Sequence, residues 1–177
     1  YNGKPIDEDY YISLCTKNPG MRLAWGDLAE RTEFNTKDYA NSDITAKYNY
    51  NNSLSTDLDT RDLKPEDDIV QQNWPSGWSI PTAKDFNQLV ENTIVTKETI
   101  DGHTWFRFTS KINGNSILIP GTGFIDDKPN IEKWDTSTYL QSSTIGISSN
   151  TVSGTTKLKR TIYALNISGT SAKLQST

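Results

Sequence analysis

Two glycine-containing dipeptides, Asp101-Gly102 and Asn113-Gly114, separate three runs that are rich in apolar and β-branched residues. The runs read TIVTKETI, HTWFRFTSK and NSILIP, at residues 93–100, 103–111 and 115–120. Asp-Gly and Asn-Gly adopt the positive φ angles that tight hairpin turns require, so each dipeptide favours a chain reversal. The pattern predicts three antiparallel strands joined by two hairpins.

Two short helices are predicted before these strands. Pro65 is followed by three acidic residues, which is typical of a helix start because carboxylates there meet the positive end of the helix dipole. Pro75 biases Trp74 away from helical angles and ends this helix. In the second helix, the Thr82 hydroxyl can accept a hydrogen bond from the free amide of Asp85. We expect its buried face to consist of Phe86, Leu89 and Val90.

Further apolar runs predict strands near both ends of the chain. They read DYYISLC, MRLAWG, YLQSSTIGIS, RTIYALNIS and AKLQS, at residues 9–15, 21–26, 139–148, 160–168 and 172–176. Residues 35–62 and 126–138 are polar and keep no sustained period, which predicts long irregular loops. Early helices followed by many short strands, in a chain of 177 residues, predict a single α+β domain over residues 1–177.

The charge of the chain argues against nucleic acid as a partner. It has 18 Lys and Arg residues against 22 Asp and Glu residues, a net charge of -4, and no local cluster of basic residues to attract a phosphate backbone. No run approaches the roughly 18 apolar residues of a membrane span. Hydrophobic residues make up only 33% of the chain, which predicts a thin core and long polar loops.

Cysteine and methionine usage bears on location. Cys15 is the only cysteine, which excludes an internal disulfide and zinc sites built on several cysteines. The chain begins at Tyr1, contains one Met, and is rich in Asn, Thr and Ser, as exported bacterial surface proteins are. We therefore expect an extracytoplasmic protein, present as a mature or trimmed fragment whose leader, if any, is gone.

His103 is the only histidine, so any Ser-His-Asp or Cys-His machinery depends on it. It directly follows a hairpin turn, where we expect the imidazole to face solvent, and we do not predict nucleophilic catalysis. Gly121 and Gly123 match the start of a dinucleotide-binding fingerprint, but the third glycine and the following helix are missing. We interpret both as turn glycines.

An acidic run, DLDTRDLKPEDD, spans residues 57–68. Asp57, Asp59 and Asp62 offer oxygen ligands of the kind that Ca²⁺ prefers, although Arg61 interrupts the spacing of an EF-hand loop. The other interpretation is a solvated helix start whose carboxylates favour the helix dipole. We expect no cofactor, with Ca²⁺ at these residues as the alternative.

Exposed aromatic rings beside Asn and Asp suit sugar recognition, since a sugar stacks on a ring face and hydrogen-bonds to planar polar groups. The second polar loop holds such a set, the candidate ligand-binding residues Asp126, Asp127, Asn130, Trp134 and Tyr139. Tyr48 and Tyr50 form a secondary set in the first loop. For Trp134 the other interpretation is an anchor that ties the loop to the core. A glycosidase carboxylate pair such as Asp126 with Glu132 is conceivable, but nothing in the spacing selects it.

Four stretches of the chain, LAWGDL, EDDIVQQNWPSGWSIPTAKDFNQLVEN, NGNSILIPGTGFIDD and YLQSS, resemble the Fibrobacter succinogenes major paralogous domain. This family is abundant in surface proteins of gut and rumen bacteria, and the resemblance covers about residues 22–143. It implies a C-type-lectin-like fold, related to the sulfatase-modifying-factor group, with two short helices and a small irregular antiparallel sheet. It also implies a module without enzymatic activity.

The resemblance further implies that Trp74, Trp78, Pro81 and Thr82 hold the two helices against the sheet. Together with Phe86 and Leu89 they form the expected structural core. The family's closing strand, GFSVRPV, has no counterpart in this chain. We therefore expect that a neighbouring domain or partner supplies what the sheet lacks.

These inferences combine into one leading functional hypothesis. We expect a non-catalytic, extracytoplasmic binding or adhesion module of a bacterial surface protein, which meets a glycan or protein ligand through residues 126–139 and, secondarily, residues 48–62. The alternative is an assembly domain of a surface fibre or multidomain protein that pairs through an open sheet edge. A hydrolase is the third hypothesis.

Overall fold

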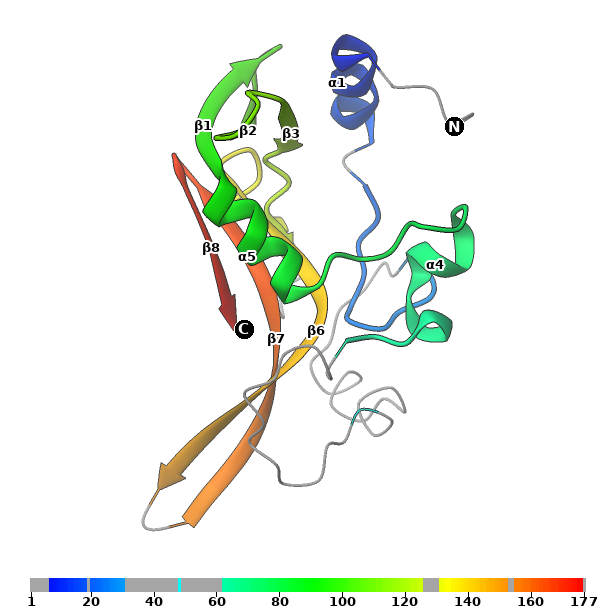
Figure 1. Cartoon of the computed structure of the whole chain (residues 1–177), viewed down its shortest axis with the longest axis vertical. Helices are drawn as coiled ribbons and strands as arrows, with labels where there is room; N and C mark the ends of the chain where they lie inside the picture. Colours follow the sequence, from blue (N-terminus) through cyan, green and yellow to red (C-terminus); the bar gives the residue numbers. More distant parts are fainter. Residues whose placement is uncertain are drawn as a thin grey trace.

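The computed structural model describes residues 7–18, 20–30, 48, 62–125, 131–152 and 155–176. Within these ranges the fold is α+β, with three α-helices and three small antiparallel sheets (Figure 1). The helices are α1 (Glu8–Lys17), the 3-10 helix η2 (Pro65–Asp67), α4 (Ile69–Asn73) and α5 (Ala83–Asn92). The strands are β1 (Thr93–Ile100), β2 (His103–Ser110), β3 (Ser116–Pro120), β4 (Phe124–Ile125), β5 (Ile131–Glu132), β6 (Ser137–Val152), β7 (Thr155–Ser168) and β8 (Ser171–Ser176).

The three strands predicted around the Asp-Gly and Asn-Gly dipeptides are confirmed. They form one antiparallel sheet in the order β1-β2-β3, and Ile100 pairs with His103 across the first hairpin. The later strand predictions are confirmed as a second antiparallel sheet, in the order β6-β7-β8. In Figure 1, β6 and β7 run on together as a two-stranded ribbon that extends away from α5.

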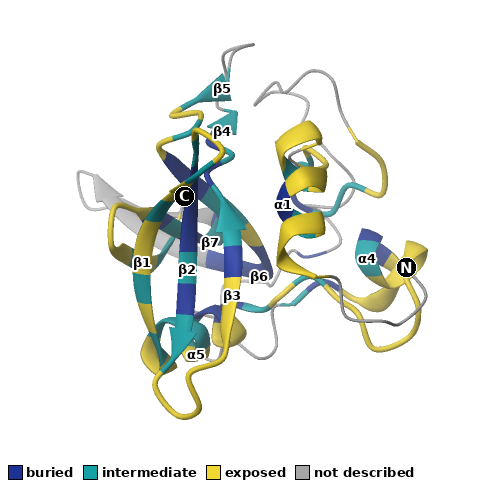
Figure 2. Cartoon of the chain, turned by 90° about the horizontal axis from the view of Figure 1, so that it is seen from above, coloured by how far each residue is buried: buried dark blue, intermediate teal, exposed yellow. Residues whose placement is uncertain are grey.

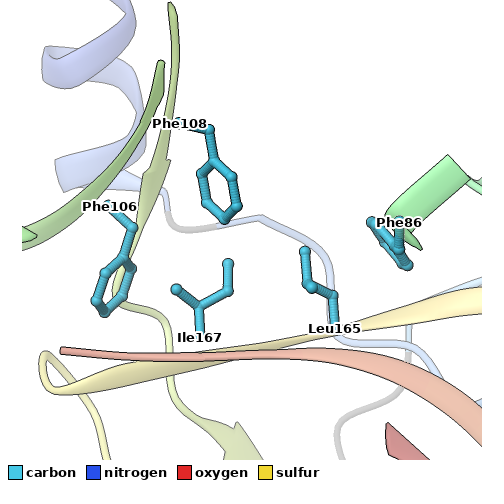
Figure 3. Close-up of a cluster of buried hydrophobic side chains, with 5 residues drawn as sticks. All are labelled: Phe86, Phe106, Phe108, Leu165 and Ile167. Carbon is cyan, nitrogen blue, oxygen red and sulfur yellow. The ribbon is translucent and has the colours of Figure 1, made fainter. Parts of the chain in front are cut away.

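The main core lies between these two sheets and α5. Phe106 and Phe108, two residues apart on β2, point to one face of the first sheet and meet Leu165 and Ile167 of β7 (Figure 3). Phe86 of α5 completes the cluster. Burial of each such side chain contributes about 1.5–3 kcal/mol. The predicted buried face of α5 is confirmed, because Leu89 and Val90 pack against the same cluster.

The start of α5 is built as predicted. The Thr82 hydroxyl accepts a hydrogen bond from the Asp85 amide at 3.1 Å, and the Asp85 carboxylate accepts the Thr82 amide at 2.8 Å. Pro81, expected in the core, is exposed, and it acts through its carbonyl, which accepts the Ser143 amide of β6 at 2.9 Å. The Ala83 amide also bonds to β6, through the Thr144 hydroxyl at 2.9 Å. The amino end of α5 is therefore fixed to β6 by backbone groups.

The strand predicted at residues 9–15 is wrong, because this segment belongs to helix α1. The Asp7 side chain accepts the Tyr10 amide at 3.0 Å and caps the helix, and acidic residues fill its first turn. Ile12 is buried against Trp105 and Leu118, on the face of the first sheet opposite to the main core. Figure 2 shows α1 beside this sheet with its outer surface exposed, while β2 carries most of the buried residues.

A third hydrophobic cluster packs three residues from the first part of the chain against Ile145 of β6. Residues 21–26, predicted as a strand, form no strand, and their Trp25 is buried against Tyr48, Leu63 and Ile145. Strand β6 has an irregularity between Gln141 and Ile145. Residues 62–63 pair with β6 at this point through a short antiparallel bridge. The indole therefore anchors this part of the chain to β6.

The expectation that Trp74 and Trp78 belong to the core is wrong. Their side chains are 47% and 56% exposed. The segment is anchored by other groups: Ile69 is buried, and the fully buried Asp68 carboxylate accepts the amides of Val70 at 2.8 Å and Ile80 at 2.9 Å. Because these groups fix both ends of the segment, the two indoles are left at the surface.

Candidate functional site

Trp134 lies in the turn between β5 and β6, and its side chain is 43% exposed. The residues on either side of it, Lys133 and Asp135, both have left-handed backbone angles, with φ of 51° and 57°. Such angles are uncommon outside glycine and often occur at functional sites, where surrounding contacts must hold them. The indole is thus presented by a tightly wound turn.

Hydrogen bonds hold this turn against the first sheet. The Asp135 amide donates to the Gly121 carbonyl at 2.9 Å, and the Asp135 carboxylate accepts the Thr104 amide at the start of β2. The Thr136 hydroxyl closes the turn on itself by donating to the Lys133 carbonyl at 2.8 Å. Trp134 therefore sits on a backbone fixed at several points.

Gly123 allows the turn to pack this closely. A Cβ atom at this position would lie 2.3 Å from the Glu132 carbonyl oxygen and 2.9 Å from the Trp134 nitrogen. Its φ of 64° is also left-handed, which glycine adopts without strain. Gly121 and Gly123 thus serve close backbone packing, and Gly123 forms an isolated bridge with Thr138 rather than a turn.

A small open pocket of about 20 Å³ adjoins the turn. It is lined by Cys15, Thr16, His103, Thr104, Trp105, Pro120, Gly121, Thr122, Trp134 and Asp135. A cavity of this size holds about one water molecule, whereas sites that enclose small molecules span roughly 300–1,000 Å³. A ligand would therefore lie across the rim, against Trp134, and insert a single polar group.

The pocket wall contains an unsatisfied donor. Trp105 is almost fully buried, and its Nε1–H has no hydrogen-bond partner among the residues that the structure describes. A buried polar group without a partner costs about 1–3 kcal/mol. This nitrogen is closed off from solvent, so it bears on the stability of the wall and not on contact with a ligand.

Three residues that could support nucleophilic chemistry line the same pocket: Cys15, His103 and Asp135. The His103 Nδ1 atom lies 3.8 Å from an Asp135 oxygen, beyond hydrogen-bond distance. A nucleophilic thiol needs a base in contact with it, but within the described ranges no hydrogen bond joins Cys15 to His103. Cys15 instead neighbours Tyr11, and burial first, then this thiol, raises the pKa of the Tyr11 hydroxyl.

Of the other candidate residues of the second loop, the structure describes Tyr139. Asp126, Asp127 and Asn130 lie outside the described residues. Tyr139 is partly buried and packs on Phe124, with 4.6 Å between ring centroids. The Lys133 ammonium lies 5.8 Å from the centre of the Tyr139 ring. Tyr139 therefore belongs to a packed cation–aromatic group, and of the two described members of the expected set Trp134 lines the pocket and Tyr139 does not.

Tyr48 does not form a ligand surface as predicted. Its side chain is only 2% exposed, its hydroxyl donates to Asp67 at 2.6 Å, and it accepts the Lys64 amide at 2.7 Å. Burial first, and then the hydrogen bond to Asp67, raises the pKa of the Tyr48 hydroxyl. Tyr50 lies outside the described residues.

The acidic run is structural where it is described. Asp57 and Asp59 lie outside the described residues, and Asp62 bonds to the Thr144 hydroxyl. Asp67 and Asp68 are buried, so the interpretation of a solvated helix start is wrong for these two residues. Among the described residues, no group of three or more His, Cys, Asp or Glu side chains could hold a metal ion.

Sequence reasoning missed several residues of the pocket. His103 and Trp105 are two residues apart on a strand and so share a face, a signal that could have paired them. Cys15 and Thr16 gave no such signal, because residues 9–15 predict a strand, Thr16 lies outside every predicted element, and helix α1 is what brings both residues here. The pocket is thus assembled from segments that are distant in sequence.

No helix within the described ranges is both long and apolar enough to cross a membrane. The resemblance of residues 22–143 to the family stays a prediction. No family model, curated protein or solved structure matches the chain.

Proposed function

We propose that this chain is a non-catalytic, extracytoplasmic binding or adhesion module that contacts a glycan at Trp134. The observation that carries the proposal is an exposed indole, fixed by a left-handed turn, at the rim of a small pocket. Sugars are bound by stacking of their apolar face on an aromatic ring together with directional hydrogen bonds from polar neighbours.

The groups around Trp134 can supply both kinds of contact. The indole face is available for stacking, since the side chain is partly exposed. Asp135 offers a carboxylate acceptor and His103 an imidazole, and both line the pocket. A sugar hydroxyl that both donates and accepts matches this mixture better than a purely anionic or purely cationic group.

The rigidity of the turn also supports binding. Ordering a flexible side chain at an interface costs about 0.5–1.5 kcal/mol, and a preformed contact avoids much of that cost. Asp135 is bonded to both Gly121 and Thr104 before any ligand arrives. The site thus needs little rearrangement to present its ring.

The family resemblance supports the wider assignment. We propose that the fold is C-type-lectin-like and that the module belongs to a bacterial surface protein with adjoining domains. The order of α4, α5 and a small antiparallel sheet agrees with this expectation.

A second function, assembly through a sheet edge, is favoured by one observation. β8 is an edge strand of the β6-β7-β8 sheet, and an edge strand can pair with another chain. Lys173 in the middle of β8 is exposed, however, and lysine is a residue that protects edges from pairing. We therefore place glycan binding first.

A glycan array with the parent chain and Trp134→Ala tests the proposal. We expect the parent to bind at least one glycan reproducibly and the variant to lose that glycan, with an unchanged melting temperature. Tyr10→Ala is the matched control, because Tyr10 is an exposed aromatic residue outside the pocket. An array on which Trp134→Ala keeps every glycan that the parent binds would contradict the site, and silent arrays with concentration-dependent oligomers would favour assembly.

A further inference from the structure

We infer that the tryptophan loop, defined as residues 69–79, is a second contact surface, separate from the Trp134 site, for an uncharged carbohydrate chain. The loop carries the two exposed indoles Trp74 and Trp78. Helix α4 forms the first part of this loop. Figure 2 shows α4 well apart from β5, the strand that leads into the Trp134 turn. The inference therefore concerns different residues and a different face of the molecule.

A single buried carboxylate closes the loop. Asp68 accepts the amides of Val70 and Gln71 with one oxygen, at 2.8 and 3.2 Å, and the amide of Ile80 with the other, at 2.9 Å. Compact loops with closely spaced ends are frequently functional. Asp68 thus joins both ends of the loop and fixes its outer part as a unit.

A tight turn separates the two indoles. The chain turns at Ser76-Gly77, and Gly77 has a left-handed φ of 95° with no atom near the position of a Cβ. Pro75 precedes the turn and restricts the backbone next to Trp74. Trp74 and Trp78 therefore lie on either side of this turn, and Pro75 limits the backbone freedom of Trp74.

The chemistry around the indoles points to an uncharged ligand. Residues 69–79 contain no Asp, Glu, Lys or Arg, in a chain in which such residues make up 23%. Residues 71–79 are all exposed. A charged ligand would find no partner in the loop itself, whereas the hydroxyl groups of a neutral sugar chain need only hydrogen-bonding groups and ring faces.

Three side-chain amides supply those hydrogen-bonding groups. Gln71, Gln72 and Asn73 each donate an N–H to the protein, to the Asp68 carboxylate and to the carbonyls of Pro65 and Ile69. These bonds orient the amides, and within the described part of the chain no hydrogen bond uses their oxygen atoms. The oxygens are thus preoriented acceptors on exposed residues beside the two indoles.

Affinity electrophoresis of the full chain in gels that contain a panel of neutral polysaccharides, namely β-glucan, mannan and arabinogalactan, tests the inference. We expect at least one of them to retard the parent chain, and the double variant Trp74→Ala, Trp78→Ala to bind it at least about tenfold more weakly, which equals about 1.4 kcal/mol. Trp78→Tyr keeps an aromatic face and should retain most of the binding. If the double variant does not fold, the single variant Trp78→Ala, which removes an exposed ring, keeps the test decisive because it should weaken binding while Trp78→Tyr does not.

Controls separate this inference from the Trp134 proposal and from other partners. Trp134→Ala leaves the tryptophan loop intact, so retardation by the panel polysaccharide should persist in that variant. Equal retardation of the parent and the double variant, or no retardation by any neutral polysaccharide, would overturn the inference. Loss of binding to phosphatidylcholine vesicles in the double variant, with unchanged polysaccharide binding, would assign the indoles to a lipid surface and overturn it as well.

Discussion

Arg107 on β2 holds both carboxylate oxygens of Glu8, although the two residues are 99 positions apart in the chain. The nitrogen–oxygen distances are 2.7 and 2.9 Å, and the same guanidinium also binds Glu98 on the neighbouring strand β1. This two-pronged ion pair joins the first turn of α1 to the sheet face that carries Trp105. Since α1 provides Cys15 and Thr16 to the pocket, the pair helps to position one of its walls.

Glu8→Gln should make stability less dependent on pH in acid. Hydrogen bonds from Arg107 lower the pKa of Glu8 from its ordinary value of 4.5, so the pair stabilises the fold above that pH and is lost as pH falls through the lower, folded value. Because Glu8 is half exposed, the effect at neutral pH should be about 0.2–1 kcal/mol. Urea unfolding at pH 7 and pH 3 measures the unfolding free energies of the parent and of Glu8→Gln. The difference between the two free energies should be smaller at pH 3 than at pH 7.

Asp9→Asn is the matched control for this prediction. Asp9 lies in the same first turn and contributes to the same helix dipole, but it has no ion pair with Arg107. If Asp9→Asn changed the acid dependence as much as Glu8→Gln, the ion pair would not be its source.

Phe86→Ala and Trp78→Ala should differ sharply in their effect on stability. Phe86 is buried in the main core, and truncation of such a ring costs about 3–5 kcal/mol. Trp78 is 56% exposed, and surface substitutions usually change stability by less than about 0.5 kcal/mol. Chemical denaturation of both variants measures the difference in unfolding free energy. Equal losses would show that the Trp78 ring is buried in the core.

Asp68→Ala should destabilise the protein and release the tryptophan loop. The buried carboxylate accepts several backbone amides, and hydrogen bonds to a charged group contribute about 1.5–3 kcal/mol each. Hydrogen exchange followed by mass spectrometry should show faster exchange across residues 69–80. Asp68→Asn, which keeps one good capping oxygen, should lose less stability, and slow exchange in the alanine variant would contradict this role of Asp68.

Gly123→Ala should cost stability and weaken ligand binding at Trp134. The new methyl group would lie 2.3 Å from the Glu132 carbonyl oxygen and would strain a left-handed backbone. We expect the loss of unfolding free energy to exceed the about 1–3 kcal/mol that such backbone strain alone costs. Gly114→Ala is the control, since its φ is also positive, at 74°, but no atom lies within 4 Å of the added group. The difference in unfolding midpoint between the two variants isolates the clash, and equal midpoints would exclude it.

The elements set by local chemistry were predictable from the sequence. Asp101-Gly102 reverses the chain whatever surrounds it, and Thr82 with Asp85 caps α5 through contacts three residues apart. The three-stranded sheet and the buried face of α5 follow from these signals and from the spacing of apolar residues.

The elements that depend on distant contacts were not predictable. Residues 9–15 combine aromatic and β-branched side chains that favour a strand, yet they form a helix because Ile12 packs on Trp105 and Glu8 pairs with Arg107. The exposure of Trp78 likewise depends on Asp68, which bonds to Ile80 on the far side of the loop. For the site, Trp134 could be proposed from its neighbours in sequence, but its pocket could not.

The packing of Phe86 against Leu165 and Ile167 has a consequence for synthesis of the chain. The ribosome adds residues at about 5–20 per second, so α5 leaves it several seconds before its partners on β7 exist. Until then the apolar side of α5 and the phenylalanines of β2 stay in contact with water. Cellular chaperones therefore encounter a nascent chain whose main hydrophobic core can form only after β7 has left the ribosome.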